Sequence, residues 1–372
     1  MKEGWEYKEL GEVAFYSTNR IPSSSIDEKN YVGVDNLLKD RKGKINATVV
    51  PVEGNCISYE CGDILVGNIR PYLKKIWLAN RDGGASGDVL VIRTNNHQKL
   101  QSNYLYWVLA NDTFFQYNML HSKGAKMPRG NKVDILKYIV PIPSLSEQQH
   151  IVEELELLSS IIEKKKAQLK ELDNLAQSLF YEMFGDPITN EKGWEVSKIG
   201  EIASFYNGKA HENAINDDGK YIVVNAKYIS SNGDIIKKTN KQLFPLYTND
   251  IVMVMSDVPN GKALARCSLI TSDNSYSLNQ RICAFREYKQ NPIYLLFVLN
   301  RNNYYLGFDD GNGQTNLRKN EVINCPVPLP PLALQQQFAS KIEAIEHQKE
   351  LIKQSIKEVE TLFNSRMDYY FN

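Results

Sequence analysis

The stretch "GWEYKELGEVAFY" at residues 4–16 is written again, with few changes, as "GWEVSKIGEIASFY" at residues 193–206. The second copy begins just past the midpoint of the 372-residue chain. Self-similarity at a fixed offset is the signature of a structural unit used more than once. The chain is therefore predicted to contain one fold twice.

Later segments extend the repeat in the same order. The strand pattern "GDILVGN" (62–68) corresponds to "NDIVMVMSD" (249–257), each entered through a Gly/Asn-Asp turn. The helix pattern "SNYLYWVLAN" (102–111) corresponds to "NPIYLLFVLN" (291–300), with Ser102 and Asn291 as expected N-caps. The proline-rich strand ends "VPIPSLSEQQHIV" (140–152) and "VPLPPLALQQQFA" (327–339) close the two copies. Strands and short helices in this order predict an α+β fold for each copy.

A long helix is predicted after each proline-rich segment. Apolar residues recur in steps of four and three from Ile151 to Met183 and again from Phe338 to Tyr370. A sustained 3.5-residue period is typical of a coiled-coil seam. The seam includes Leu155, Leu158, Ile162, Leu169 and Leu172 in the first helix and Ile345, Ile352, Ile356 and Val359 in the second. Lys165 and Lys349 interrupt it, either to set the register or with their ammonium groups reaching solvent.

The expected domains are residues 1–143 and 186–331, joined by helical segments 144–185 and 332–372. Gly185 and Pro187 predict the end of the first helix. If the two globular copies share a fold, the second helix can bury its seam within the chain only by running back along the first. The expectation is a long antiparallel coiled-coil pair and a pseudo-twofold internal repeat. Dimerisation of two chains through the helices is the alternative.

Composition and motifs exclude several classes of protein. No apolar run is long enough to span a membrane, and the start lacks an apolar signal core, so a cytoplasmic protein is expected. Net charge is zero, which argues against a strong stand-alone polyanion binder. Five scattered cysteines give neither zinc-site nor disulfide spacing. No phosphate-binding or dinucleotide glycine motif occurs, and "NPIY" (291–294) fits a helix cap better than a methyltransferase motif.

Four polar loops combine basic residues with Asn and Gln, which suit phosphates and base edges. They are "GNIRPYLKKIW" (67–77), "SKGAKMPRGNK" (122–132), "SDVPNGKALAR" (256–266) and "DGNGQTNLRKN" (310–320). Any single residue among them is better explained as a solvated side chain, but four loops at corresponding places favour nucleic acid. The candidate DNA contacts are Asn68, Arg70, Lys74, Lys75, Lys126, Arg129, Asn260, Lys262, Gln314, Asn316, Arg318 and Lys319.

The "GWE…LGE" openings, the "GDIL" and "NDIV" strands, the "GQTNL" loop and the "PIPSLSEQQ" and "PLPPLALQQQ" junctions together resemble the specificity subunits of type I restriction–modification systems. The resemblance implies two target-recognition domains that read the halves of a bipartite double-stranded DNA site, with the helices as spacer. It implies two methyltransferase subunits that carry S-adenosylmethionine, and restriction subunits that use ATP and Mg. This chain would hold no cofactor and catalyse nothing. The junction glutamines Gln148, Gln149, Gln335 and Gln336 are the expected partner contacts.

The loops differ between the copies while the frame repeats, so the two half-sites are expected to differ. "GAKMPRGNK" lacks the Gln/Asn-Leu form of "GQTNL", for example. Two other classes of function stay open at this point. One is a fused DNA-modifying enzyme whose motifs are unrecognised, and the other is a coiled-coil scaffold that does not bind DNA.

Overall fold

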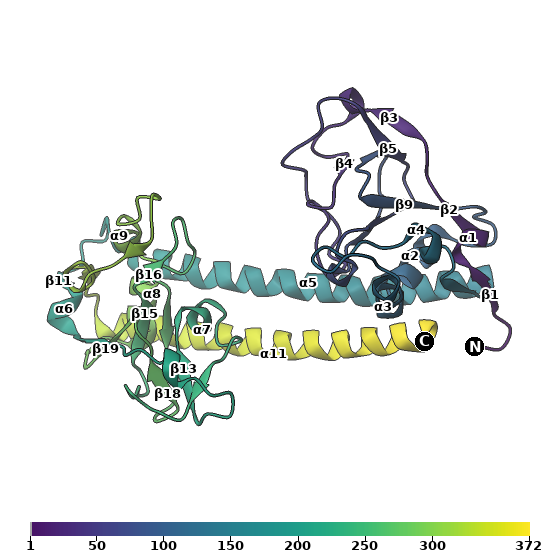
Figure 1. The fold of residues 1–372 in the computed structure, drawn as a ribbon. Coiled ribbons are helices and arrows are strands. Elements are labelled where there is room, and N and C mark those ends of the chain that lie inside the picture. The colour runs from purple at the N-terminus through teal and green to yellow at the C-terminus, as the bar shows by residue number, and fades with distance from the viewer. Residues whose placement is uncertain (1) are drawn as a thin grey trace. The chain divides into compact units, whose positions relative to one another are not determined.

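A four-stranded antiparallel sheet lies at the centre of each of two units in the computed structural model, which describes residues 2–372 (Figure 1). Unit 1 comprises the chain up to Lys166 together with residues 354–372, and unit 2 comprises residues 167–353. Both units mix strands with helices, as the sequence predicts. Two helices of 40 residues, α5 (Leu145–Phe184) and α11 (Leu332–Phe371), contribute to both units.

In unit 1 the central sheet has the strand order β2-β9-β6-β7, and a second sheet has the order β3-β5-β8-β4. Strands β1 and β10 form a separate antiparallel pair. The elements are β1 (Glu6–Glu9), α1 (Leu10–Val13), β2 (Ala14–Tyr16), β3 (Arg20–Pro22), η1 (Ser23–Ser25), β4 (Tyr31–Val32), β5 (Asn55–Tyr59), β6 (Ile64–Gly67), η2 (Pro71–Leu73), β7 (Ile76–Leu78), β8 (Gly83–Ala85), β9 (Val89–Thr94), α2 (Ser102–Ala110), α3 (Asp112–Leu120), α4 (Lys132–Ile135) and β10 (Ile139–Ile142).

Unit 2 has a corresponding central sheet with the order β12-β19-β15-β17, a sheet β14-β13-β18, and the pairs β11-β21 and β16-β20. Its elements are β11 (Val196–Lys198), α6 (Ile199–Ile202), β12 (Ser204–Asn207), η3 (Glu212–Ala214), β13 (Tyr221–Val224), α7 (Ala226–Ser230), β14 (Lys238–Thr239), β15 (Ile251–Val254), β16 (Ser256–Asp257), β17 (Cys267–Leu269), β18 (Tyr276–Leu278), β19 (Ile282–Arg286), α8 (Pro292–Leu299), α9 (Asn303–Leu306), β20 (Thr315–Asn316), α10 (Lys319–Ile323) and β21 (Pro326–Pro328).

The expected helix cap is right in one copy and wrong in the other. Asn291 accepts hydrogen bonds from the backbone N–H groups of Ile293 and Tyr294 and caps α8. In α2 the capping position belongs to Gln101, and no side chain caps it. Ser102 is instead the first helical residue, and its hydroxyl lies 3.3 Å from that of Thr94. The side-chain cap is therefore a feature of unit 2 alone.

In each unit α5 and α11 run antiparallel where they meet. In unit 1 Glu154 binds Arg366 and Lys166 binds Glu360, so rising numbers in one helix meet falling numbers in the other. All predicted seam positions in unit 1 are buried or half-buried: Ile151, Leu155, Leu158, Ile162, Lys165, Ile356, Val359, Phe363, Arg366 and Tyr370. The helix faces that the heptad pattern selects are thus the faces that pack.

Unit 2 repeats this packing with the other half of each helix. The seam positions Leu169, Leu172, Ala176, Leu179, Met183, Phe338, Ile342, Ile345, Lys349 and Ile352 are buried or half-buried. The ammonium of Lys349 lies 2.7 Å from carboxylate oxygens of both Asp173 and Glu346, which accounts for a lysine in the seam. Gly185 follows α5 with φ of 77°, a left-handed conformation that glycine adopts readily.

Candidate nucleic-acid interface

Two polar loops of unit 1 lie against each other beyond the end of β6. Ile69 and Arg129 form an antiparallel bridge. The Arg70 N–H donates to the Pro128 carbonyl at 2.7 Å, and the Gly130 N–H donates to the Asn68 carbonyl at 3.0 Å. The structure therefore brings together the loops that the sequence places 55 residues apart, at 67–77 and 122–132. Their backbones form one platform.

The matching loops of unit 2 pair in the same way. Strands β16 and β20 are antiparallel, with Ser256 opposite Asn316 and Asp257 opposite Thr315. The Asp257 carboxylate accepts hydrogen bonds from the N–H groups of Ala263 and Leu264, at 2.6 and 3.1 Å, which closes the loop after β16. These backbone and side-chain bonds order both loops of unit 2.

The basic candidates of unit 1 divide into exposed and half-buried side chains. Arg70, Lys126 and Arg129 are exposed. Lys74 is half-buried and forms an ion pair with Asp112 at 2.9 Å. The ammonium of Lys75 donates to the Val34 carbonyl at 2.5 Å, and burial lowers its pKa. Lys74 and Lys75 are thus committed to contacts with other parts of unit 1.

Asn68 is a correction to the expected DNA contacts. Its side chain is buried, because the residue directly follows the buried strand β6, and its Oδ1 accepts no hydrogen bond within residues 2–372. A Cβ added at Gly130 would approach this Oδ1 to 2.7 Å, so the glycine is required by the close packing. Asn68 supports the platform and does not face outward.

The candidates of unit 2 are all exposed: Asn260, Lys262, Gln314, Asn316, Arg318 and Lys319. Gln314 Nε2 donates to the Ser256 hydroxyl at 2.7 Å, and that hydroxyl donates to Asn316 Oδ1 at 2.7 Å. Arg318 occupies the capping position of α10, with its N–H bound to Glu321. Gln314 and Asn316 are the amides that the structure holds in a defined orientation.

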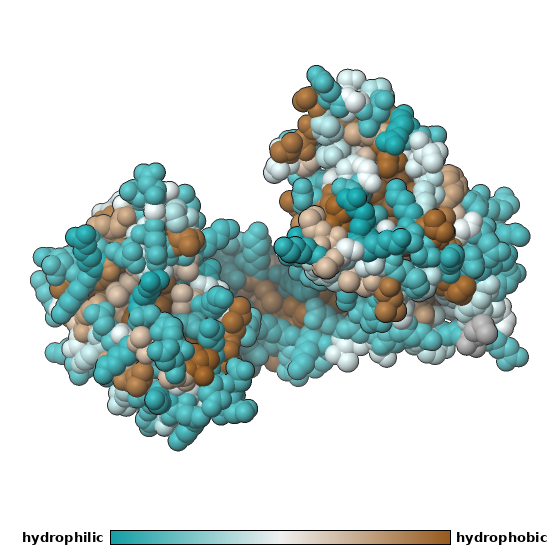
Figure 2. All heavy atoms as spheres, viewed as in Figure 1, coloured by the Kyte–Doolittle hydropathy of each residue, from teal (hydrophilic) through white to brown (hydrophobic). Residues whose placement is uncertain are grey.

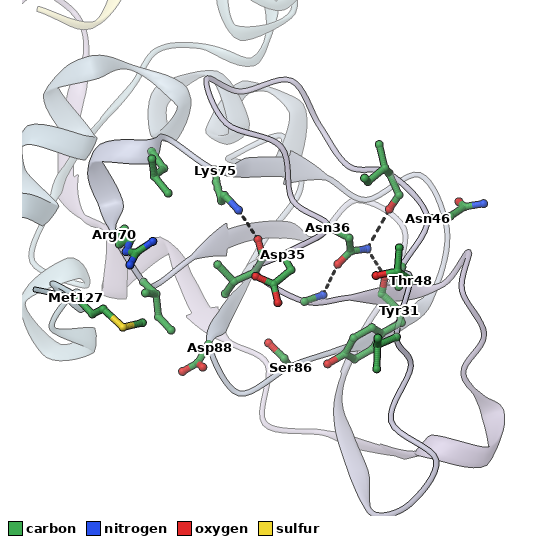
Figure 3. A pocket seen from close by; sticks show the side chains of 17 residues that line it. Tyr31, Asp35, Asn36, Asn46, Thr48, Arg70, Lys75, Ser86, Asp88 and Met127 are labelled. Carbon is green, nitrogen blue, oxygen red and sulfur yellow. Dashed lines mark hydrogen bonds between the residues drawn. The ribbon is translucent and has the colours of Figure 1, made fainter. Parts of the chain in front are cut away.

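A cavity of about 670 Å³ opens beside the loops of unit 1 (Figure 3). Arg70, Asp88 and Met127 line one part of it, and Asn36 and Asn46 line another. Asn36 is buried and holds the loop after β4, accepting from the Gly33 N–H at 2.6 Å. Charged and amide groups together with a flexible apolar side chain suit the edges of bases as well as phosphates.

Apolar residues on the long loop between β4 and β5 rise out of unit 1. Val49 and Val52 are 79% and 89% exposed, and Ile45 and Val49 also line the cavity. Hydrophobic side chains are visible on this side of the unit in Figure 2, among a largely hydrophilic surface. Exposed apolar side chains beside a polar cavity are typical of a contact surface.

Backbone hydrogen bonds fix where Asn68 and Arg129 lie in unit 1. The Asn68 N–H donates to the carbonyl of Asp88 at 2.9 Å, while its own carbonyl accepts from Gly130. Arg129, one residue before Gly130, faces Ile69 across the bridge. Its guanidinium lies 2.9 Å from the Asp88 carboxylate. Asp88 is a residue of the candidate site that the sequence did not indicate, since it lies outside both polar loops.

The same bonds recur in unit 2. The Met255 N–H donates to the carbonyl of Arg281 at 2.9 Å, and the Met255 carbonyl accepts from the Leu317 N–H at 2.8 Å. Asn316, one residue before Leu317, faces Ser256. Corresponding pairs of residues are therefore Asn68 and Met255, Ile69 and Ser256, Asp88 and Arg281, Arg129 and Asn316, and Gly130 and Leu317.

The family model for the type I restriction modification DNA specificity domain matches the chain twice, over residues 2–173 and over residues 191–361. The chain belongs to this family. The two matches account for most of the sequence, and their boundary falls near the start of the second "GWE" copy.

Known members resemble the chain to different extents. The type I restriction enzyme EcoDI specificity subunit of Escherichia coli is 28% identical over half of this chain, and the match spans 42% of that protein. The MjaVIII specificity subunit of Methanocaldococcus jannaschii is 21% identical over 96% of this chain and 90% of its own length. A chain from a solved type I restriction–modification system, studied for its assembly and conformational transition, has the same fold, with a TM-score of 0.59 and 20% identity over 100% of this chain and 98% of that one.

The prediction that all four junction glutamines contact a partner subunit is wrong for two of them. Gln148 and Gln335 are buried. Gln148 accepts from the Gln101 N–H at 2.9 Å and donates to the carbonyls of Lys99 and Pro143. Gln335 likewise accepts from the Asn291 N–H at 2.8 Å. These two side chains tie the start of each long helix to its own unit and have no free face for a partner.

Gln149 and Gln336, one position further along each helix, are exposed. They remain available as predicted contacts of a partner subunit. Among residues 2–372, no helix is long and apolar enough to cross a membrane, and no group of three or more His, Cys, Asp or Glu residues could hold a metal.

Proposed function

We propose that the chain is the DNA-specificity subunit of a type I restriction–modification complex, and that each unit reads one half of a bipartite double-stranded site. The observation that carries the proposal is the pair of loops built at the same backbone position in both units, within a chain that the family model matches twice. The loops differ in sequence between the units, so the two half-sites differ.

Two kinds of contact follow from the exposed side chains. Arg70, Lys126, Lys262 and Lys319 are cations that suit phosphates, which fix position and register without reading sequence. Arg129, Gln314 and Asn316 can form paired hydrogen bonds to base edges in the major groove. Because the chain carries no net charge, partner subunits supply part of the phosphate contact.

The helices α5 and α11 form the spacer as an antiparallel coiled coil in a duplicated, pseudo-twofold chain. The support is the heptad seam, which is buried or half-buried at every predicted position. One extra heptad in each helix adds about 10 Å, the length of about three base pairs. Inserting a heptad into both helices is expected to lengthen the spacer of the recognised site by a few base pairs. An unchanged spacer would contradict this role of the helices.

The partners are two methyltransferase subunits that carry S-adenosylmethionine, with ATP- and Mg-dependent restriction subunits as further members of the complex. Exposed leucines on the long helices, including Leu157 at 61% and Leu351 at 54%, offer apolar surface for them in addition to the polar side chains of Gln149 and Gln336. Methylation requires the target base to leave the helix stack, which is the task of the catalytic partner. This chain selects the DNA sequence and positions the methyltransferase subunits on it.

The test is single-molecule sequencing of DNA from cells that express the methyltransferase subunit with or without this chain. The expected result is N6-methyladenine in a split, asymmetric motif that appears only when the chain is present. Methylation of the same motif in the absence of the chain would favour the scaffold. S-adenosylmethionine binding by the isolated chain, measured by calorimetry, would favour an unrecognised enzyme.

A further inference from the structure

We propose that the two units read different bases from the same position of their shared frame: Arg129 reads a guanine in one half-site, and Asn316 reads an adenine in the other. Asp88 positions Arg129, and Ser256 with Gln314 positions Asn316. This inference rests on the proposed function, because it assumes that the units contact a bipartite DNA site.

In unit 1 the backbone and the side chain of Arg129 are both fixed. Its N–H donates to the Lys123 carbonyl at 2.9 Å, and its carbonyl accepts from the Lys123 N–H at 3.0 Å. One guanidinium nitrogen, Nη2, lies 2.9 Å from Asp88 Oδ1, while 58% of the arginine side chain stays exposed. A guanidinium has five N–H donors in a planar fork, so donors remain for a ligand. Guanine offers the matching pair of acceptors, O6 and N7, in the major groove.

In unit 2 the amide of Asn316 is held through both of its ends. Oδ1 accepts from the Ser256 hydroxyl at 2.7 Å, and Nδ2 donates to the Gln314 carbonyl at 3.3 Å. Each contact uses one of the two hydrogen-bonding places on that atom. The oxygen can still accept from the adenine N6 amino group while the nitrogen donates to N7, which is the pairing that Asn forms with adenine.

The side chains next to Arg129 suit a guanidinium, and those next to Asn316 suit an amide. Neither set would position the other side chain. The position of Asp88 in unit 1 is occupied by Arg281 in unit 2. A carboxylate orients a guanidinium through a charge-assisted hydrogen bond, whereas Arg281 would repel an arginine at position 316. The hydroxyl of Ser256, which orients the amide, is replaced by the apolar side chain of Ile69 in unit 1. The reader and its support thus differ together between the units.

The experiment uses the complete chain in complex with its methyltransferase subunit, after the wild-type motif has been mapped. Each guanine of the motif is replaced in turn by 7-deazaguanine, and each adenine other than the methylated one by 7-deazaadenine, since both analogues lack the N7 acceptor. Arg129→Ala is expected to lower the methylation rate on the wild-type site by roughly 5- to 150-fold and to relax one guanine position. The analogue at that guanine should weaken the wild type and leave Arg129→Ala unaffected.

Asn316→Ala is expected to behave in the same way with 7-deazaadenine, at one adenine of the other half-site. Arg129→Lys keeps the charge without the fork and can still reach guanine O6 or N7, so it should relax that guanine less than Arg129→Ala does. Asp88→Asn should relax that guanine too, which a merely structural role would not produce. The matched control is Lys126→Ala, in the same loop as Arg129, which should lower methylation evenly across sequences.

The outcomes separate this inference from the function on which it rests. A wild-type complex without a bipartite motif would overturn the proposed function. A clear wild-type motif that Arg129→Ala and Asn316→Ala leave unchanged would overturn only the assignment of bases. Relaxation in either half-site at a base other than the one assigned would also overturn it.

Discussion

Arg93 donates two hydrogen bonds to the buried carboxylate of Asp63, from Nε at 2.8 Å and from Nη2 at 2.7 Å. Unit 2 has the same arrangement, in which Arg286 binds Asp250 at 2.7 and 2.6 Å. In unit 1 the pair joins the residue before β6 to the neighbouring strand β9, and in unit 2 it joins the residue before β15 to the neighbouring strand β19. The hydrogen bonds to the aspartates raise the pKa of both arginines. The "GD" and "ND" turns of the repeat therefore supply a buried anion that fixes the sheet.

Replacing Asp250 by Asn is expected to lower the free energy of unfolding by about 3–5 kcal/mol, since it leaves the Arg286 charge without its buried partner. Urea unfolding followed by circular dichroism measures this. The matched control is Lys137→Met, which removes an exposed ion pair with Asp134 and should change the free energy of unfolding far less. Equal losses in the two variants would contradict a structural role for the buried pair.

Substitutions of the two glutamines at the first junction should distinguish an effect on folding from an effect on partner binding. Gln148→Ala leaves the Gln101 N–H and two carbonyls without partners and is expected to destabilise unit 1 by about 2 kcal/mol or more. Gln149→Ala should change the unfolding free energy by about 0.5 kcal/mol or less, because Gln149 is exposed. Thermal unfolding of both variants, with co-purification of the methyltransferase subunit, distinguishes them. A stable Gln148→Ala protein would argue against the anchoring role.

The two paired loops of unit 2 should be sensitive at a glycine in the first loop and tolerant at a glycine in the second. A Cβ at Gly261 would overlap the Asp257 carboxylate that closes the loop, whereas Gly313 has open space around the corresponding point. Gly261→Ala is therefore expected to relax the half-site read by unit 2 and to leave the other half-site unchanged. Gly313→Ala should preserve both. Mapping the methylation motif of each variant provides the readout. Relaxation of the half-site read by unit 1 would contradict this prediction.

The contact between α5 and α11 in unit 1 should depend on pH. Partial burial raises the pKa of Glu154, but hydrogen bonds from Arg366 and Tyr370 outweigh it and place the pKa below the ordinary value of 4.5. A depressed pKa adds stability above the unfolded value and loses it as pH falls through the folded value. The wild type should thus exceed Glu154→Gln in free energy of unfolding at pH 6, by about 1 kcal/mol or less, and the difference should vanish as the pH falls well below 4.5. Urea unfolding of both proteins across this pH range measures the difference. A constant difference would contradict the linkage.

The duplicated fold and the packed faces of the long helices are predictable, because both follow from regular patterns in the sequence. A 3.5-residue period identifies the packed faces of α5 and α11, and the repeated "GWE" and proline-rich segments indicate the duplication. The exact side-chain contacts are less accessible. Gln148 and Gln149 are identical in type, and only the rotation of about 100° per helical residue decides which one is buried. Asn68 similarly takes its burial from the end of β6.

The supporting residues of the candidate site carry no local signal. Arg93 lies 30 residues from Asp63, and Asp88 lies 41 residues from Arg129, so tertiary folding alone brings these partners together. The correspondence of Arg129 with Asn316 is also hidden, because the loops around them differ in composition. Backbone hydrogen bonds reveal it, since they are shared by both units whatever the side chains are.

The most direct test of the account is the motif methylated by a chain in which residues 186–331 are replaced by a second copy of residues 1–143. If each unit reads its own half-site, this chimera should direct methylation to an inverted repeat of the half-site assigned to unit 1, whereas the wild type directs it to an asymmetric site. An asymmetric motif unchanged from the wild type would show that the units do not determine the half-sites.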